Sequence, residues 1–188
     1  MQEYQQQLMQ IIFQHVPNPT NGAEIGVSDG GTSKALLGEF PMLRLHMVDP
    51  WTTFEKGHDY YDSGDSAARR SQKKNDNVMS KALQRTQFAS ARRVVHRSYS
   101  SEAAAQVVEQ SLDFAFIDGD HTYEAVQLDL QLWSSKVRPG GLLCGHDCGH
   151  PRDKRGLWGV ARAVHEFAEP HSLVVKIGAG TIWWIHPL

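Results

Sequence analysis

The chain has 188 residues, of which 40% are hydrophobic and 21% charged, proportions typical of a single globular domain with a sizeable core. Its formal net charge of −2 at pH 7 excludes the strongly basic surface that nucleic acid or an anionic membrane would require. No apolar run approaches the roughly 20 residues that span a bilayer, and its few cysteines cannot build a disulfide framework, so we expect a cytoplasmic protein.

The N-terminal stretch, residues 1–15, is rich in glutamine and carries Leu8, Ile11 and Ile12 on one side. This spacing predicts an amphipathic helix that Pro17 and Pro19 end. We expect the helix to pack on a sheet or on another subunit, with no part in the chemistry.

A strand is predicted for residues 23–27, and a turn containing Gly30 and Gly31 joins it to a helix. Such a turn lets a ligand approach the backbone N–H groups at the start of the helix. Ser28 stands where the dinucleotide fingerprint G-x-G-x-x-G needs a glycine, which disfavours an NAD-dependent oxidoreductase. Glu24, inside the strand, adds a carboxylate beside the turn.

A second strand, residues 43–48, ends at Asp49, roughly 20 residues after the glycine turn. Doubly wound nucleotide-binding folds hold ribose hydroxyls at this place, because a carboxylate accepts two hydrogen bonds from a vicinal diol. The alternative is that Asp49 only starts a turn before Pro50.

Residues 51–88 form the most polar and least patterned part of the chain. A long insertion beside the ligand-binding edge of a sheet indicates a lid or a substrate-recognition segment. A solvated helical excursion without substrate contact is the alternative.

A third strand is predicted at residues 93–96, and Ser98 follows directly at its end, where it could contact a ligand. A helix is predicted from Glu102 to Gln110.

The stretch from residue 112 to residue 147 reads as strand, helix, strand, and polar side chains follow each strand. Asp118, Asp120 and His121 come after residues 112–117, and His146 and Asp147 come after residues 142–144. A helical connection makes the two strands parallel, so their carboxyl ends share one edge of the sheet. We therefore expect these side chains to converge at the edge where open α/β sheets bind ligands.

Two β-rich runs, residues 173–177 and 181–185, are separated by only three residues. Such a short connection joins antiparallel strands. The chain is thus predicted to be an α/β protein with a Rossmann-like, doubly wound, seven-stranded sheet, mostly parallel and closed by a C-terminal antiparallel hairpin. Trp183 and Trp184 alternate across the last strand, which leaves a homodimer contact open.

This layout resembles that of class I S-adenosylmethionine-dependent methyltransferases. The segment EIGVSDGGTS, residues 24–33, resembles the first motif of that family, and VDPW, residues 48–51, resembles the second. The segments FIDGDHTYEAV, RPGGLLCGHD and GVARAVHEF resemble a bacterial branch of small-molecule methyltransferases related to those acting on antibiotic and sugar hydroxyls. The resemblance covers nearly the whole chain except residues 51–88.

The resemblance implies S-adenosylmethionine as the cofactor and assigns residues to its parts. Glu24, Gly26 and Gly30 match the motif around the methionine moiety, and Asp49 matches the ribose ligand. Ser98 and Asp118 complete the expected cofactor-binding set.

In metal-dependent members of the superfamily, a divalent cation is held by an acidic residue after the fourth strand and by two oxygen ligands after the fifth. Carried over to this chain, the expected ligands of Mg²⁺ or Mn²⁺ are Asp118, His146 and Asp147. His146 departs from the pattern, since imidazole suits Mn, Fe, Zn or Ni better than Mg²⁺. A zinc site within residues 144–150 is disfavoured, because an extended segment does not wrap an ion.

The resulting prediction is an O-methyltransferase acting on a small-molecule hydroxyl with the help of a divalent metal at Asp118 and Asp147. The metal would orient the acceptor oxygen and lower its pKa, and His121 or His146 would take the proton. The first alternative is a metal-independent methyltransferase with His121 as general base. The second is a non-catalytic nucleotide-binding module.

Overall fold

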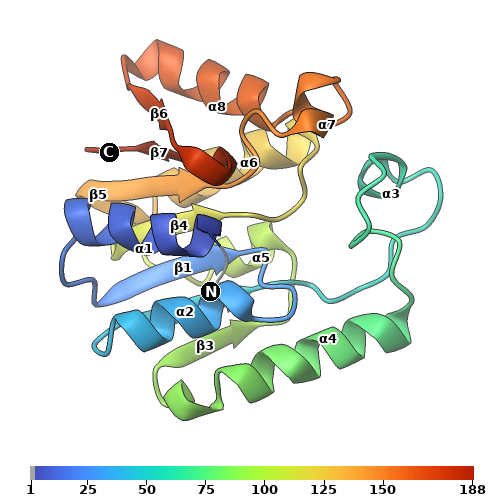
Figure 1. Ribbon diagram of the computed structural model, residues 1–188, viewed down its shortest axis with the longest axis horizontal. Helices are drawn as coiled ribbons and strands as arrows, with labels where there is room; N and C mark the ends of the chain where they lie inside the picture. The colour runs from blue at the N-terminus through green and yellow to red at the C-terminus, as the bar shows by residue number, and fades with distance from the viewer. Residues whose placement is uncertain (1–2) are drawn as a thin grey trace.

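A computed structural model describes residues 3–188 and contains a seven-stranded sheet with helices on both faces (Figure 1). The strands are β1 (Asn21–Ile25), β2 (Arg44–Val48), β3 (Arg93–His96), β4 (Leu112–Ile117), β5 (Val137–Gly145), β6 (Val175–Ile177) and β7 (Trp183–Ile185). Their order is β3-β2-β1-β4-β5-β7-β6. Strands β1 to β5 are parallel, and β7 runs antiparallel to both β5 and β6. The predicted Rossmann-like sheet with a C-terminal antiparallel pair is confirmed.

Helices cover both faces of the sheet, which is why the strands are apolar on both sides. The first face carries α1 (Glu3–His15), α2 (Gly31–Glu39) and α4 (Gln72–Arg85), and the second carries α5 (Ser100–Ala104), α6 (Tyr123–Ser134) and α8 (Val160–Ala168). Strand β4 shows the alternation: Phe114 and Phe116 pack in the first core, whereas Ala115 and Ile117 pack in the second. None of the helices within residues 3–188 has the length and apolarity to span a membrane.

Two element boundaries differ from the sequence-based expectation. The helix predicted to reach Gln110 ends at Ala104, and Gln110 itself has a φ of +53°, which a helix cannot contain. The apolar period after residue 122 predicts a helix that reaches Val137 and stops at the proline and glycines of residues 139–141. In the structure, Val137 belongs to β5 instead, because the β4–β5 pairing shifts register between Leu112 and Phe114. A bulge of this kind admits a proline and two glycines inside the strand, where they read as a helix stop in the sequence.

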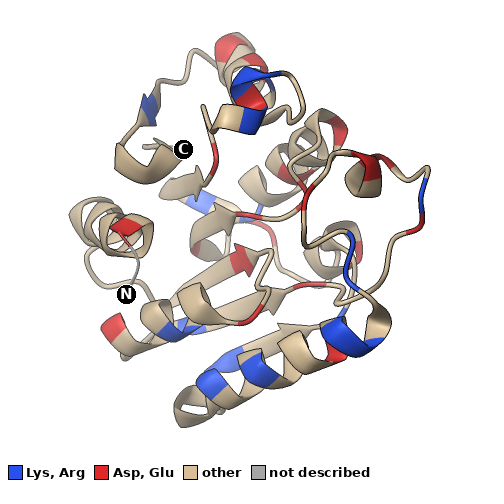
Figure 2. Ribbon diagram, turned by 45° about the vertical axis from the view of Figure 1, so that its right-hand side comes forward, with Lys and Arg blue, Asp and Glu red and all other residues tan. Residues whose placement is uncertain are grey.

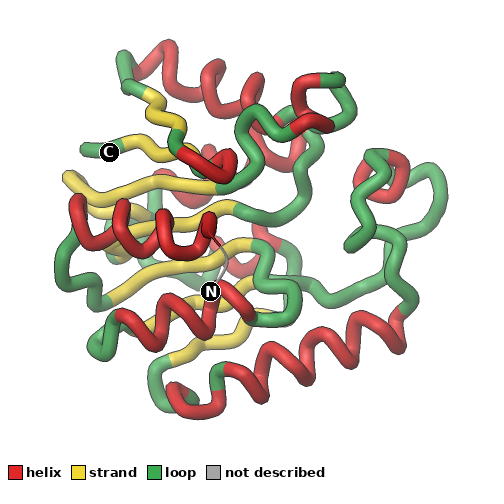
Figure 3. Tube along the Cα trace, viewed as in Figure 1, coloured by secondary structure: helices red, strands yellow, loops and turns green. Residues whose placement is uncertain are grey.

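The segment from residue 51 to residue 88 divides into two unlike parts. Its second part is α4, the crossover helix between β2 and β3, which packs on α2 through the buried Ala82. Only a narrow apolar stripe of α4 faces the core, so its period is weak in the sequence. Its first part is mostly loop, with one short helix, α3 (Asp59–Asp62), and projects beyond the carboxyl ends of the parallel strands (Figure 3). The lid prediction therefore concerns residues 51–71 and stays a prediction.

The remaining short elements are α7 (Pro151–Lys154) and the 3₁₀ turns η1 (Gln87–Ala89), η2 (Glu169–His171) and η3 (Ala179–Thr181). Helix α7 follows β5 and lies across from α3 at the same edge of the sheet (Figure 1). This edge is where the candidate site lies.

Candidate functional site

Two adjoining cavities open at the carboxyl edge of the parallel strands. A cavity of about 450 Å³ is lined by the loops after β1, β2 and β4 and by residues of the 51–75 segment. A more polar cavity of about 810 Å³ lies between the start of α1 and the loop after β1. Gly26, Ser28 and Asp118 line both cavities, so the loops after β1 and β4 separate them. Figure 2 shows acidic positions along the loops at this edge, whereas basic positions gather on α4.

Gly26 is the point of closest approach between these two loops. Its φ is +94°, and a Cβ at this position would lie 2.1 Å from the carbonyl oxygen of Asp118. Only glycine fits there, because any side chain would meet backbone that cannot move aside. Gly30 has a φ of +74° and lets α2 approach Ala82 of α4, but it lines neither cavity.

Three residues other than glycine adopt positive φ on the loops that follow β1, β2 and β5. They are Ser28 at +48°, Trp51 at +42° and Asp147 at +65°. Such a backbone is unfavourable, above all for a bulky residue such as tryptophan, and it persists only when surrounding contacts impose it. The concentration of strained positions on these loops is typical of a functional site.

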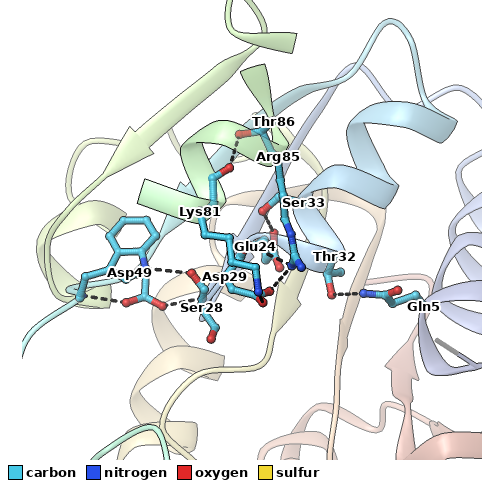
Figure 4. Close-up of polar contacts among 12 residues, drawn as sticks. Gln5, Glu24, Ser28, Asp29, Thr32, Ser33, Asp49, Lys81, Arg85 and Thr86 are labelled. Carbon is cyan, nitrogen blue, oxygen red and sulfur yellow. Dashed lines mark hydrogen bonds and ion pairs between the residues drawn. The ribbon is translucent and has the colours of Figure 1, made fainter. Parts of the chain in front are cut away.

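Asp49 holds the loop after β1 against the loop after β2 (Figure 4). Its Oδ2 accepts a hydrogen bond from the Ser28 N–H at 2.8 Å, and its Oδ1 accepts one from the Trp51 N–H at 2.8 Å. Burial raises the pKa of Asp49, and these backbone donors oppose that shift. Asp49 lines the 450 Å³ cavity, and a carboxylate oxygen can accept more than one hydrogen bond, so the turn-forming and the ribose-binding interpretations are compatible.

Glu24 and Asp29 have different roles beside the glycine turn (Figure 4). The Glu24 carboxyl is buried, accepts a hydrogen bond from the Ser33 hydroxyl, and has a pKa raised well above 4.5 by burial. It borders the 810 Å³ cavity. Asp29 forms ion pairs with Lys81 at 2.8 Å and Arg85 at 2.5 Å, which fasten the turn to α4.

The polar residues after β4 and β5 come together in one cluster. His121 Nε2 lies 3.0 Å from Asp147 Oδ2 and 3.6 Å from Asp118 Oδ1. His146 Nδ1 lies 3.3 Å from Asp147 Oδ2 and 3.5 Å from Asp118 Oδ1. Asp120 stands apart, because its carboxylate accepts a hydrogen bond from the Thr122 N–H in the turn that leads into α6.

The carboxylates of this cluster control its electrostatics. Burial lowers the pKa of each imidazole, but attraction to the surrounding carboxylates outweighs burial, so the pKa of His146 is raised to about 10 and that of His121 well above 6.5. The pKa of Asp147 is lowered correspondingly, mainly by the two histidines against the effect of burial. Both imidazoles are therefore charged near neutral pH when no cation neutralises the carboxylates, which disfavours His121 as a general base without metal.

The donor atoms of Asp118, His121 and Asp147 lie within 4.8 Å of one another, which is close enough for one cation to contact all three. The set expected from the sequence contained His146 instead of His121. Both histidines lie beside the two carboxylates, but the set of donor atoms that lie within 4.8 Å of one another contains that of His121.

Three contacts of the cluster have no signal in the local sequence around it. Asp65 Oδ2 lies 3.0 Å from His121 Nδ1, and the rings of His121 and Trp158 stack with centroids 4.2 Å apart. The Tyr4 ring lies 4.5 Å from that of His146, and the Tyr4 hydroxyl lies 3.1 Å from Thr32 Oγ1. Tyr4 stands one helical turn before Leu8, so the apolar face of α1 could have identified it as inward-facing.

Ser98, like Gly30, is a predicted cofactor residue that lines neither cavity. The residues that line the 450 Å³ cavity after β3 are Tyr99, Ser100 and Ser101. The Ser98 hydroxyl is buried without a hydrogen-bond partner among the described residues. The strand end was identified correctly from the sequence, but the lining of the cavity begins one residue further along, at Tyr99.

Comparison with known proteins gives a family and a fold. A family described as a methyltransferase domain matches residues 23–148. The N-methyltransferase NodS from Bradyrhizobium japonicum is similar in structure, with a TM-score of 0.64 and 14% identity over 98% of this chain and 94% of that chain. An O-methyltransferase from Bacillus cereus is also similar, with a TM-score of 0.64 and 15% identity over 99% of this chain and 82% of that chain. No protein of curated function matches the sequence.

Proposed function

Since this chain belongs to the methyltransferase domain family, we propose that it transfers a methyl group from S-adenosylmethionine to a hydroxyl of a small-molecule acceptor, assisted by a divalent metal at Asp118 and Asp147. The observation that carries the proposal is the position of Asp118. It lines both cavities and also faces Asp147 and the two histidines, so cofactor, acceptor and metal would meet at one carboxylate.

The 450 Å³ cavity suits the adenosine part of the cofactor. Asp49 offers acceptors for ribose hydroxyls, and Trp51, Phe54 and Leu128 supply apolar surface for a flat base. The 810 Å³ cavity is the more polar of the two and begins at the methionine-side glycine, Gly26. NodS and the Bacillus cereus enzyme were both solved with S-adenosylhomocysteine, the product that methyl transfer leaves behind.

A sulfonium methyl is already activated, so the chain has to align the acceptor oxygen with it and remove the proton of the hydroxyl. Asp118 and Asp147 would hold a divalent cation, which when bound lowers the pKa of the acceptor hydroxyl. His146, on the other side of the two carboxylates, stands within reach to receive the released proton. The Tyr4 ring packs against the His146 ring, with centroids 4.5 Å apart, and helps to orient it.

Oxygen is preferred over nitrogen as the acceptor because of the paired carboxylates. A neutral amine needs no metal to become nucleophilic, so two buried acids beside two histidines would have no task in simple N-methylation. The metal-independent alternative lacks a neutral histidine, as both imidazoles are charged without a cation. A non-catalytic binding module would leave the cluster without a purpose.

The test is a calorimetric titration of chelator-treated protein with S-adenosylhomocysteine, repeated with Mn²⁺ and then with Mg²⁺. We expect cofactor binding in every run and additional metal binding in the metal runs. Transfer of a labelled methyl group to a panel of polyhydroxylated and amine acceptors then distinguishes O- from N-methylation. Labelling of amines alone, unaffected by chelator, would refute the proposal.

A further inference from the structure

His121 is the one imidazole in the cluster whose two ring nitrogens both face carboxylates. Nδ1 lies 3.0 Å from Oδ2 of Asp65, which the loop after α3 carries, and Nε2 faces Asp118 and Asp147, which follow β4 and β5. The His121 side chain is only 11% exposed and that of Asp65 only 12%. The contact between them is therefore largely shielded from water.

The Asp65 contact determines the state of the opposite nitrogen. When Nδ1–H donates to Asp65, the neutral ring carries its lone pair on Nε2. Nε2 is buried, and although it lies 3.0 Å from Asp147 Oδ2, its direction does not meet hydrogen-bond geometry. A lone pair aimed at two carboxylates is repulsive, so either the proton that Nε2 carries without metal or a metal cation must lie between them. A metal that replaces this proton has to contact all three groups. Asp118, His121 and Asp147 fit this requirement, since their donor atoms lie within 4.8 Å of one another.

Asp65 itself is held in a defined position. Its Oδ1 accepts a hydrogen bond from the Ala67 N–H at 2.8 Å, which leaves Oδ2 for His121. The neighbouring Gly64 carbonyl accepts a hydrogen bond from the guanidinium of Arg152 on α7, and Trp158 lies in the loop that follows this helix. Trp158 stacks on His121 with an interplanar angle of 18°. The loop after α3 and the loop after β5 thus hold the His121 ring from two sides.

We propose that Asp65 is the positioning residue of the metal site: it fixes His121, rather than His146, as the third ligand beside Asp118 and Asp147, so that binding of the metal and closure of residues 57–67 stabilise each other. This inference rests on the proposed function. A carboxylate that accepts the distal N–H of a ligating histidine fixes the ring orientation and makes the ligating nitrogen more basic. Here that carboxylate comes from the predicted lid, so metal binding and closure of residues 57–67 are coupled.

The ligand set also selects the metal. Two carboxylate oxygens and one imidazole nitrogen favour Mn²⁺, Fe²⁺, Co²⁺ or Zn²⁺ over Mg²⁺ and Ca²⁺, which prefer oxygen alone. We therefore expect Mn²⁺ to bind more tightly than Mg²⁺.

The experiment measures binding of Mn²⁺ to the full chain by the loss of the free-ion electron paramagnetic resonance signal, in the presence of S-adenosylhomocysteine. We expect Asp65→Asn to weaken Mn²⁺ binding by about 10- to 100-fold, the usual effect of losing such a partner. Asp62→Asn is the matched control, because Asp62 lies on α3 in the same segment and is exposed. Asp65→Glu, which restores a carboxylate, is expected to recover part of the affinity.

A second measurement follows amide hydrogen exchange of residues 57–67. Mn²⁺ is expected to slow this exchange in the parent protein and in Asp62→Asn but not in Asp65→Asn. His121→Ala is expected to weaken Mn²⁺ binding more than His146→Ala.

The outcomes separate this inference from the proposed function. Equal Mn²⁺ affinity in the parent and Asp65→Asn, or a larger effect of His146→Ala, would overturn the role of Asp65 while leaving metal-assisted transfer intact. Absence of Mn²⁺, Zn²⁺ and Mg²⁺ binding to the parent protein would overturn both.

Discussion

Replacing Asp49 separates its two roles, shaping a turn and binding a ribose. In Asp49→Ala, the N–H groups of Ser28 and Trp51 each lose an acceptor that now lies at 2.8 Å. A hydrogen bond from a half-buried N–H to a carboxylate contributes roughly 1.5 kcal/mol, so the pair contributes about 3 kcal/mol to the free energy of unfolding. For a chain of this length, that loss lowers the Tm by about 6 to 12 °C.

The ribose role adds a second, independent effect on the cofactor. Ribose hydroxyls left without their acceptor are expected to weaken S-adenosylhomocysteine binding by about 1 to 3 kcal/mol, or roughly 5- to 150-fold. Asp49→Asn keeps one oxygen acceptor and is expected to lose about half of each quantity. The control is Asp76→Ala, which removes an exposed ion pair with Arg97 and is expected to change little.

The assay combines thermal unfolding of the ligand-free protein with calorimetric titration of S-adenosylhomocysteine at a temperature where every variant is folded. A lowered Tm with unchanged affinity would refute the ribose role and leave Asp49 as a turn residue. Unchanged Tm with lowered affinity would show that the two backbone contacts contribute little to stability.

Three further predictions concern other parts of the molecule. Gly26→Ala is expected to cost at least about 2 kcal/mol of stability, because residue 26 has a φ of +94° and its Cβ would meet the Asp118 carbonyl. The control is Gly38→Ala, in open space on α2, which is expected to stabilise the protein by up to about 1 kcal/mol. Equal urea midpoints for the two variants would contradict this prediction. Asp147→Asn is expected to weaken Mn²⁺ binding at least about tenfold and S-adenosylhomocysteine binding less than about twofold, since Asp147 lines neither cavity. Equal losses of affinity for Mn²⁺ and for S-adenosylhomocysteine, measured by calorimetry, would argue against a metal role. Burial, with a smaller contribution from His96, lowers the pKa of His46 from 6.5 to about 4. The unfolded chain therefore binds this proton more readily, and stability is lost as pH falls from 6.5 toward 4. His46→Asn is expected to flatten that part of the plot of unfolding free energy against pH, measured with urea, and parallel plots for the parent and the variant would count against it.

The sequence by itself determined which strands of the sheet run parallel and which run antiparallel. Residues 112–117 alternate between two cores, and the helical period that follows them requires a parallel return strand, so the pattern alone indicates the edge that carries Asp118 and Asp147. The short connection before Trp183 likewise required an antiparallel pair. The hydrophobic period and the length of a connection are local properties of the sequence, and they suffice to decide whether two successive strands run parallel or antiparallel.

Weak local signals explain the errors. The sequence pattern merges α4 with an insertion because this helix buries little apolar surface, and it extends a helix over Val137 because the bulge in β5 resembles a helix stop. It favours Ser98 because Ser98 follows the strand end closely, whereas the residues after β3 that line the 450 Å³ cavity are Tyr99, Ser100 and Ser101.

Only the tertiary structure decided which side chains complete the cluster. Asp65 reaches His121 across 56 positions of the chain, and Tyr4 reaches His146 from the first helix. No period or spacing encodes the Asp65 contact, because loops without repeating structure approach each other through packing of the whole domain. The helical period of α1 indicates that Tyr4 faces inward, but not that it meets His146. The sequence placed two carboxylates and two histidines at one edge of a sheet, and the packing of a distant loop distinguished His121, which Asp65 holds, from His146, which it does not contact.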